Sequence, residues 1–378
     1  MEQQQQARGE RTRFAAVVLA LGAALFLLIA LNTFLHTSGW GFDFEAYFLA
    51  AERLARGDGI YQPWTLAAPF RPGNYGLYLY APPLAVATLP FTMLSLPTAT
   101  LLWFVVRAGL LALACAVMPA RPTIRLLAFA VAAVTSPVLV DLNLGNVSVL
   151  VLALLVIVWR WLDRPAGSIA LAVAMSLRPT LGLLLVWWLL RRLWRPVVWT
   201  LLAGLVMIVM TLPIVGVQGY LDFVTVLRNV SEVTGVANNL DLGTTVLRFQ
   251  FAPILATLAL FGGYAVAIGA LLYSLRRDRE TSFMVTIGAT LLLAPLLWDH
   301  YLAGLLLPAA FLAQRGRPLA LGLPLLAWLP QPFLPFLAIA ATLLPLLAPA
   351  VTTEPVRLAE DQPPAGIAAS SNRTASPG

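Results

Sequence analysis

The chain has 378 residues, of which 60% are hydrophobic and only 11% are charged. A soluble domain carries roughly 25% charged residues, so this composition indicates an all-α polytopic membrane protein. The formal net charge of +7 comes largely from arginine clusters in short loops, which is typical of loops that stay cytoplasmic. No basic face with aromatic platforms is present, so we expect no nucleic-acid partner. The single cysteine, Cys115, excludes an intramolecular disulfide and a cysteine-based metal site.

The N-terminus combines a basic segment, residues 1–13, with an apolar run that extends to about residue 35. This charge order is that of a signal peptide, but the run is longer than a signal-peptide core and no small-residue cleavage site follows it. The sequence therefore predicts a cytoplasmic N-terminus at 1–13 and an uncleaved first span.

Apolar runs predict about twelve transmembrane helices, which place both chain ends on the cytoplasmic side. The predicted spans lie near 14–35, 79–95, 98–118, 124–140, 146–162, 167–190, 196–215, 251–275, 282–297, 300–313, 317–329 and 332–350.

The arginine clusters agree with this count only in part. Twelve spans put Arg191–Arg195, Arg276–Arg279 and Arg315–Arg317 in the cytoplasm, as the positive-inside bias requires. They send Arg121–Arg125 and Arg160–Arg164 to the other side. An arrangement with a re-entrant second run and a divided sixth run would bring these two loops inside.

The integral membrane domain is expected at 14–350, with two long outer loops at 36–78 and 216–249. The tail at 351–378 is rich in proline, alanine and serine and is predicted to be a disordered cytoplasmic segment. We find no repeat of the transporter type, in which corresponding broken helices recur in two halves.

The first outer loop contains an amphipathic helical pattern. Its apolar positions fall on one face at helical spacing: Phe44, Tyr47, Phe48, Ala51, Leu54 and Ala55. We expect a helix that lies along the membrane surface. Asp43 stands at its predicted start and Gly57 just past its end, where N-cap and C-cap residues are found.

Asp43 has two compatible interpretations. It can cap the helix by accepting a backbone N–H. Alternatively, its carboxylate, held beside Trp40 and Tyr47, can accept a proton from a hydroxyl nucleophile. Asp43 and Glu45 look like a metal-binding pair, but residues i and i+2 diverge on a helix, which weighs against a metal site.

A second polar motif, at 295–301, places Trp298, Asp299 and His300 between two apolar runs. An Asp-His pair is costly in a membrane unless it sits at an interface or faces a cavity. It is either a plain interfacial turn or a wall of the site that holds the first-loop carboxylate, because twelve spans put both on one side.

Arg178 interrupts an apolar run, and Pro179 removes a backbone donor there. Such an arginine needs a counter-charge, and the sequence offers no adjacent acid. It either snorkels to the interface or pairs with a phosphate ligand. Arg107 also lies in an apolar run and has the same two alternatives. Arg248 could reach the same phosphate-binding site as Arg178. We interpret Asn143–Asn146 as a short polar turn rather than as a functional site.

The order of several short motifs resembles glycosyltransferase family 87, the bacterial polyprenol-phosphate-mannose-dependent α-mannosyltransferases of the GT-C superfamily. These motifs are Asp43 with the helix that follows it, Gly57–Tyr61, Tyr78–Pro83, Leu144–Val147, Ser176–Pro179 and Pro295–Tyr301. Asn146 stands where a glutamine is commoner in the family, and Arg178 stands where a lysine is usual.

The resemblance implies a GT-C fold in the plasma membrane, with its active site facing the periplasm or exterior. It implies transfer of a sugar, mannose in the family, from a polyprenyl-phosphate donor to a lipid or glycan hydroxyl with inversion. Asp43 matches the family's catalytic aspartate and His300 its late histidine. We expect substrate contacts from Arg178, Arg248, Tyr47, Tyr61, Tyr80, Trp298 and Asp299.

The partners implied are membrane lipids, the polyprenyl-phosphate donor and a glycolipid or glycan acceptor, and we expect no cofactor and no metal. The competing interpretation is a transporter or flippase of a phosphate-bearing lipid, which would also need buried arginines. An O-antigen ligase-like transferase is a second enzymatic alternative. The large one-sided first loop and the lack of a repeat favour a transferase over a transporter.

Overall fold

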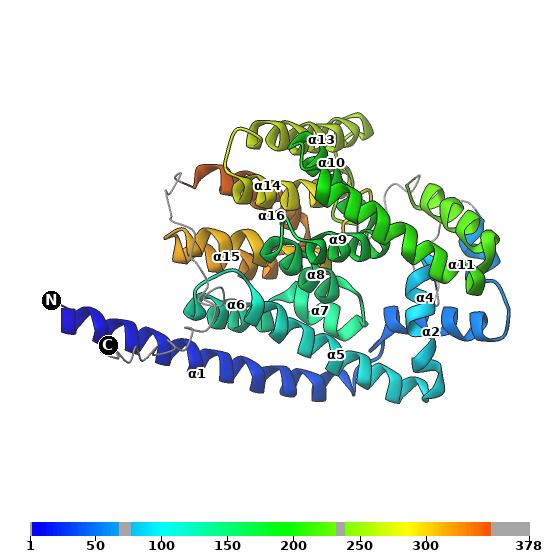
Figure 1. Ribbon diagram of the computed structural model, residues 1–378, viewed down its shortest axis with the longest axis horizontal. Helices are drawn as coiled ribbons and strands as arrows, with labels where there is room; N and C mark the ends of the chain where they lie inside the picture. Colours follow the sequence, from blue (N-terminus) through cyan, green and yellow to red (C-terminus); the bar gives the residue numbers. More distant parts are fainter. Residues whose placement is uncertain (1, 68–76, 232–238, 349–378) are drawn as a thin grey trace, which may run out of the picture. The chain divides into compact units, whose positions relative to one another are not determined.

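In the computed structural model, residues 2–67, 77–231 and 239–348 are described, and these ranges contain helices and no strand (Figure 1). They belong to one compact unit, Met1–Ala348. The predicted tail at 351–378 and parts of both predicted outer loops lie outside the described residues.

Four of the described helices are long and apolar enough to cross a bilayer, and a bent helix pair raises this number to five. The four are α1 (Glu2–Phe34), α5 (Leu96–Val117), α11 (Trp194–Ser231) and α13 (Pro253–Ser274). The bent pair, α6 (Pro122–Val134) and α7 (Ser136–Leu144), turns by 62°. The protein is thus all-helical and membrane-spanning in type, but the predicted count of twelve spans is not confirmed.

Prolines explain why several predicted spans are shorter or divided. The run at 79–95 forms α4 (Pro82–Thr88) and the 3-10 helix η1 (Leu89–Met93), which together are too short to cross. The run at 167–190 is divided at Arg178, whose backbone is extended (φ −144°, ψ 95°), into α9 (Pro165–Leu177) and α10 (Gly182–Leu190). The residue before a proline avoids the helical region, and Pro179 follows here.

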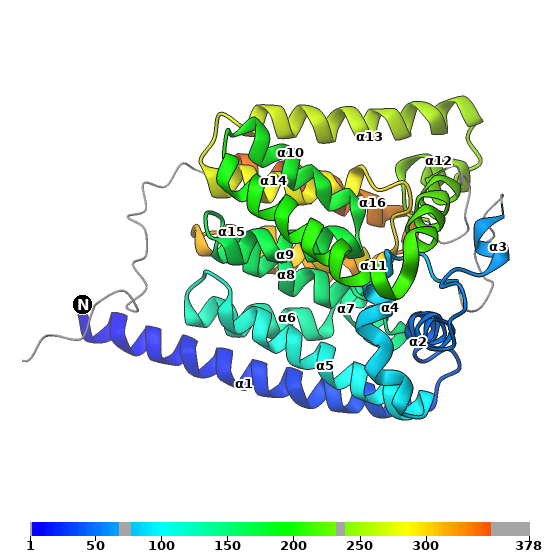
Figure 2. The ribbon, with the colours of Figure 1, turned by 45° about the vertical axis from the view of Figure 1, so that its right-hand side comes forward.

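The other described elements are α2 (Phe42–Ala55), α3 (Pro63–Leu66), α8 (Ser148–Arg160), η2 (Pro179–Leu181), α12 (Leu242–Arg248), α14 (Arg279–Leu292), η3 (Asp299–Leu305), α15 (Leu306–Gln314), η4 (Pro318–Trp328), η5 (Gln331–Phe333), α16 (Leu334–Leu343) and η6 (Leu344–Leu347). Helix α8 is apolar on all sides and packs between α5 and α9, so it lies in the protein core (Figure 2). Helix α9 packs in turn on α11, and α14 packs between α13 and α16.

All five arginine clusters of the sequence meet at one end of the helices, which we call the arginine end. Their contacts are the ion pairs Arg279–Asp163 and Arg315–Asp278 (2.8 Å) and hydrogen bonds from Arg191 to Arg277 O (2.7 Å), from Arg121 N to Gln314 Oε1 (2.9 Å) and from Arg160 to Val117 O (3.2 Å). The twelve-span order, which separated Arg121–Arg125 and Arg160–Arg164 from the rest, disagrees with this. The alternative order, with 79–95 not crossing and 167–190 divided, accounts for it.

The amphipathic helix of the first loop exists as α2, but its apolar face packs against protein. Phe44, Tyr47 and Phe48 are at most 4% exposed, and the ring of Phe44 stacks on Trp103 of α5 at 5.5 Å. Helix α2 also packs on α4 and η1. The apolar face of α2 therefore contacts protein and not lipid, because the neighbouring segments cover it. That the helix lies along the membrane surface stays a prediction.

The N-terminal end of α2 differs from the prediction, and its C-terminal end agrees with it. The N-cap of α2 is Gly41, in the left-handed region (φ 77°), and no side chain caps the helix there. Asp43 lies inside the first turn, so its predicted role as N-cap is wrong. At the other end Gly57 (φ 80°) follows the C-cap Arg56, as predicted.

The second outer loop, predicted at 216–249, is partly helical. Helix α11 continues beyond a kink at Gly216 (φ 74°, ψ 167°), and α12 forms near the end of the predicted loop. A contact of 2.5 Å between the hydroxyls of Thr211 and Tyr220 bridges the kink. Residues 232–238 lie outside the described part.

The start of α2 docks on the turn between α7 and α8. The N–H of Gly41 donates to Asn143 O at 2.8 Å. Gly145, with φ 82°, approaches so closely that a Cβ at this position would lie 2.6 Å from the Cβ of Phe44 and 3.1 Å from its N. Only glycine permits this approach, which brings the first turn of α2 against the turn.

We predict that Gly145→Ala destabilises the protein by about 2 kcal/mol or more, because it adds left-handed strain and a steric overlap with α2. The measurement is thermal unfolding in detergent. Gly109→Ala is the matched control, since a Cβ at Gly109 meets nothing within 4 Å and alanine favours the helix. Equal melting temperatures for the two variants would contradict the docking that we describe.

Candidate active site

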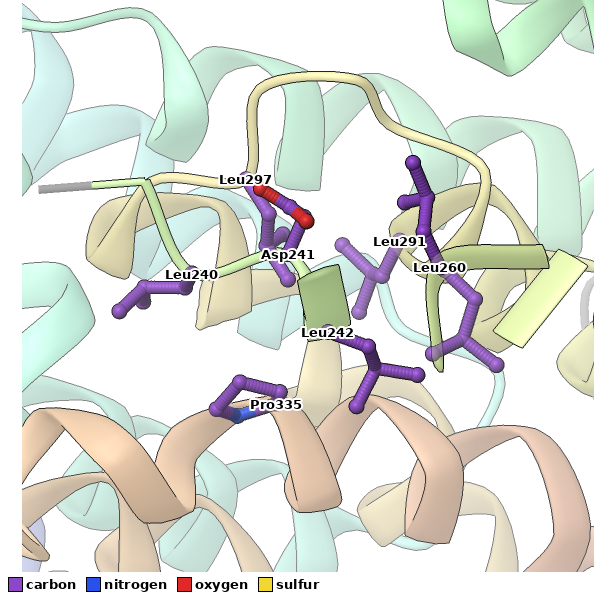
Figure 3. Close-up of a pocket in the computed structure, with 8 residues that line it drawn as sticks. Leu240, Asp241, Leu242, Leu260, Leu291, Leu297 and Pro335 are labelled. Carbon is purple, nitrogen blue, oxygen red and sulfur yellow. The ribbon is translucent and has the colours of Figure 1, made fainter. Parts of the chain in front are cut away.

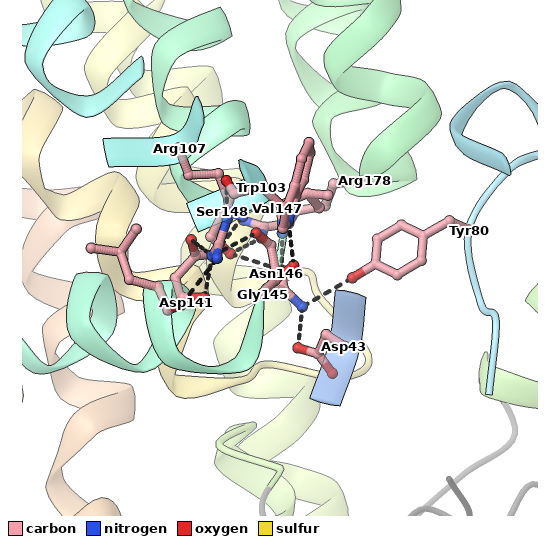
Figure 4. Close-up of polar contacts among 11 residues, drawn as sticks. Asp43, Tyr80, Trp103, Arg107, Asp141, Gly145, Asn146, Val147, Ser148 and Arg178 are labelled. Atoms are coloured by element: carbon pink, nitrogen blue, oxygen red, sulfur yellow. Dashed lines mark hydrogen bonds and ion pairs between the residues drawn. The ribbon is translucent and has the colours of Figure 1, made fainter. Parts of the chain in front are cut away.

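Asn146 joins the carboxylate of α2 to the protein core (Figure 4). Its Nδ2 donates to Asp43 Oδ2 at 2.8 Å and to the hydroxyl of Tyr80 at 3.0 Å. Its Oδ1 accepts the backbone N–H of Val147 at 2.7 Å, which fixes the orientation of the amide because a backbone N–H can only donate. Three segments therefore meet at one buried side chain: α2, the residues before α4, and the turn before α8.

Arg178 belongs to the same series of hydrogen-bonded side chains, which we call the polar chain: Asp43, Asn146, Ser148 and Arg178. Its Nη2 donates to the Oγ of Ser148 at 2.8 Å, and its guanidinium carbon lies 3.5 Å from the ring centre of Tyr301. The hydroxyl of Ser148 also reaches Asn146 Oδ1 at 3.4 Å. Arg178 is 8% exposed, and within the described ranges no carboxylate lies at ion-pair distance from it. Its position inside the protein excludes snorkelling, and its charge is suited to an anionic partner.

Arg107 and Asp141 form a fully buried ion pair at 3.2 Å beneath this turn. Arg107 also donates to the carbonyl oxygens of Asp141 (2.5 Å) and Leu142 (3.0 Å) at the end of α7. Asp141 Oδ1 accepts the N–H of Ser148 at 2.7 Å, at the start of α8. The pair thus fastens both sides of the turn that carries Asn146.

Sequence reasoning did not find Asp141. Arg107 was recognised as a buried charge, but its partner lies 34 residues further along the chain. An acidic residue inside an apolar run was the available signal, because such residues are rare in membranes without a partner. The turn 143–146 was likewise interpreted as a plain turn, whereas Asn146 makes the central contacts of the site.

Burial raises the pKa of Asp43 to about 6, and the hydrogen bond from Asn146 and the charge of Arg107 oppose this rise. Near neutral pH the carboxylate is mostly ionised but still holds protons more tightly than an exposed aspartate. A pKa close to the working pH is the property that a general base needs.

His300 lies beside Arg178 and is 6% exposed. Burial, and then the positive charge of Arg178, lower the pKa of His300 to about 3, so its ring is neutral. Its Nε2 is buried and has no hydrogen-bond partner within the described part of the chain. The ring meets Tyr301 edge-on, with centres 5.1 Å apart.

The tyrosines expected to bind substrate surround Tyr80. The ring of Tyr47 meets the Tyr80 ring edge-on at 4.9 Å. The hydroxyl of Tyr61 donates to Tyr80 O at 2.6 Å. Tyr78 fixes the same segment, because its hydroxyl donates to Ala81 O at 2.7 Å. These contacts hold Tyr80, whose hydroxyl shares the Asn146 amide with Asp43.

The structure does not place every expected residue in this cluster. Asp299 accepts from Ser136 Oγ at 3.0 Å, and its second carboxylate oxygen has no described partner. Trp298 is partly exposed and accepts the N–H of Tyr301 on its carbonyl. Arg248 lies at the end of α12 and donates to Asn239 O at 3.0 Å, so its contact differs from those of Arg178.

The chain matches the model of a known protein family. The model of glycosyltransferase family 87 matches residues 78–298, more than half of the chain. The chain belongs to glycosyltransferase family 87. No curated protein and no solved structure matches it. The matched range, 78–298, includes Tyr80, Asn146 and Arg178, whereas Asp43 lies well before it and His300 just after it.

Family membership and the apolar helices identify a membrane glycosyltransferase. In this glycosyltransferase, Asn239 fastens the polar 295–301 segment to the start of α12: its amide donates to Pro295 O at 3.0 Å and accepts the N–H of Leu297 at 2.9 Å. A small, mostly leucine-lined cavity lies beside this junction (Figure 3). Its one charged lining residue, Asp241, is occupied as the N-cap of α12.

The described residues contain no group of three or more His, Cys, Asp or Glu side chains placed to hold a metal ion. The candidate site contains the carboxylate of Asp43, the guanidinium of Arg178, amide and hydroxyl groups, and tyrosine rings. These groups can accept a proton and bind an anion.

We predict that Arg107→Ala destabilises the glycosyltransferase by about 3–5 kcal/mol, because it leaves the carboxylate of Asp141 buried without a partner. Thermal unfolding in detergent measures this loss. Val106→Ala, at a neighbouring position that is 37% exposed on the outside of α5, is the control. If both variants melt alike, the ion pair does not hold the turn.

Proposed function

We propose that this glycosyltransferase transfers a sugar, mannose, from a polyprenyl-phosphate donor to a hydroxyl of a lipid or glycan, with inversion. The observation that carries the proposal is one polar chain with a carboxylate at one end and, at the other, a cation that has no carboxylate partner among the described residues. Asp43, Asn146, Ser148 and Arg178 form this chain through successive hydrogen bonds.

Asp43 is the general base of this proposal. Its Oδ2 is held by Asn146, while Oδ1 accepts no hydrogen bond from the residues that the structure describes and is available to the acceptor hydroxyl. The acceptor oxygen forms a bond to C1 of the sugar as its proton moves to Asp43.

Arg178 receives the leaving group. As the bond from C1 to the phosphate oxygen breaks, negative charge grows on the polyprenyl phosphate, and a guanidinium stabilises it with paired hydrogen bonds. The ring of Tyr301 behind the guanidinium keeps it in place. Neutral His300, whose Nε2 has no hydrogen-bond partner among the described residues, can donate to or accept from a substrate oxygen.

The charges at the two ends of the helices support an orientation of the protein in the membrane. The arginine end is the cytoplasmic side by the positive-inside bias, and α8 leads from it to Ser148 at the opposite end. We therefore propose that the site opens to the periplasm or exterior of the plasma membrane, at the depth where a lipid-linked phosphate would lie.

A transporter or flippase would also use a buried arginine to bind a lipid phosphate. It has no need of a carboxylate held as a base beside that arginine, and the family match also favours transfer. Incubation of the purified protein with radiolabelled polyprenyl-phosphate sugars and a membrane lipid extract separates the two. Labelled product supports the transferase, whereas movement of intact donor across vesicles without product supports the transporter.

We predict that Asp43→Asn folds normally but lowers the transfer rate by about 10²–10⁴-fold, because it keeps an oxygen for the Asn146 amide and loses the proton acceptor. Glu45→Gln, on the same helix, is the control and should transfer at a near-normal rate. A folded Asp43→Asn protein with normal transfer would remove the base role. Chelator should leave wild-type transfer unchanged.

The pKa of Asp43 predicts the pH dependence of kcat/KM in the wild type. The base is active when ionised, so kcat/KM should fall about tenfold per unit below pH 6 and reach a plateau above it. The donor is a phosphodiester and does not titrate in this range. A profile without a change between pH 5 and 7 would contradict the assignment.

We predict that Arg178→Ala weakens donor binding by about 10–100-fold, the value of a hydrogen bond to a charged group. Arg178→Lys should fall between this variant and the wild type, because lysine keeps the charge and loses the paired geometry. Binding of a fluorescent polyprenyl-phosphate sugar to nanodisc-embedded protein measures the effect. Wild-type affinity in Arg178→Ala would exclude the phosphate role.

A further inference from the structure

Asn146 links Asp43 and Arg178, the two ends of the proposed polar chain. Its amide reaches Asp43 directly and reaches Arg178 through the hydroxyl of Ser148. We propose that Asn146 is a positioning residue that holds Oδ2 of Asp43, so that Oδ1 alone takes the proton of the acceptor. This inference rests on the proposed function for the role of Asp43 as a base.

The contacts show why an amide is needed. Both N–H groups of Nδ2 are used, one on Asp43 and one on Tyr80. Oδ1 accepts from Val147 N and from Ser148 Oγ. A carboxamide has two donor and two acceptor positions, so all four are occupied. Aspartate lacks the donors and alanine lacks both kinds of group.

The backbone around Asn146 is held from three sides. The indole Nε1 of Trp103 donates to Gly145 O at 2.8 Å. Arg107 reaches Asn146 O at 3.4 Å, and the carboxylate of Asp141 accepts the N–H of Ser148. A side chain on such a fixed backbone can hold its target in one geometry, which is the property of a positioning group.

Two consequences separate positioning from a purely structural role. A hydrogen bond to the ionised form of a carboxylate favours that form, so loss of the Asn146 donor should make Asp43 hold its proton more tightly. Donor binding should change little, because Arg178 keeps Ser148 and Tyr301. A variant at Asn146 should therefore lower kcat and leave the donor KM near its normal value.

The test is a titration of the Asp43 carboxyl by infrared difference spectroscopy, on purified full-length protein in nanodiscs. The band is assigned by its loss in Asp43→Asn. We expect the midpoint to rise by about one to two pH units in Asn146→Ala, the shift that corresponds to one charge-assisted hydrogen bond. Asn146→Gln, which keeps the amide, should recover part of this shift.

The control is Asn143→Ala, in the same turn. Within the described ranges its side chain accepts only from the exposed Thr37 hydroxyl, at 3.5 Å, so the midpoint should stay at the wild-type value. If Asn146→Ala does not fold, Asn146→Asp keeps the acceptor for Val147 N and removes the donor, and its kcat/KM profile should move to higher pH.

An unchanged midpoint in Asn146→Ala, or an equal shift in Asn143→Ala, overturns the inference. The infrared titration needs no turnover, so its failure differs from failure of the proposed function. A wild-type protein that transfers no sugar while the midpoint shifts as expected overturns the base role and, with it, the positioning of a base.

Discussion

The site depends on the buried ion pair between Arg107 and Asp141. Neither charge is tolerated alone in an apolar protein, and the pair is stable because backbone groups satisfy the rest of its hydrogen bonds. These groups belong to the end of α7 and the start of α8, so the pair fixes the turn between them. Asn146 projects from that turn, and α2 docks on it at Gly145, which places Asp43 within hydrogen-bond distance of Asn146.

The helices separate two kinds of charge. The five arginine clusters gather at the arginine end, and the buried polar chain from Asp43 to Arg178 lies near Ser148 at the opposite end of α8. A lipid-linked phosphate sugar has the same division, with a long apolar chain in the bilayer and a polar head near its surface. A cation held at this depth by Ser148 and Tyr301 suits such a head better than a cation on a surface loop, because less solvent screens it.

The sequence singled out the charged residues of the candidate site, but it did not predict which residues they contact. Asp43 and Arg178 could be singled out because a charged side chain in an apolar chain is costly unless it has a partner or a function. Asp141 and Asn146 were missed as partners because contacts over 34 and 103 residues leave no local pattern. The cap role of Asp43 failed because Gly41 adopts the left-handed conformation two residues earlier. The count of twelve spans is not confirmed, because prolines divide or shorten several of the described helices.

A cryo-electron microscopy structure in nanodiscs, with a non-cleavable phosphonate analogue of a polyprenyl-phosphate sugar, tests the central claim most directly. The account predicts that the phosphonate lies about 3 Å from the guanidinium of Arg178, with the sugar between it and Asp43 Oδ1. A headgroup bound instead at the arginine end or at Arg248, with Arg178 still held only by Ser148 and Tyr301, would contradict the account.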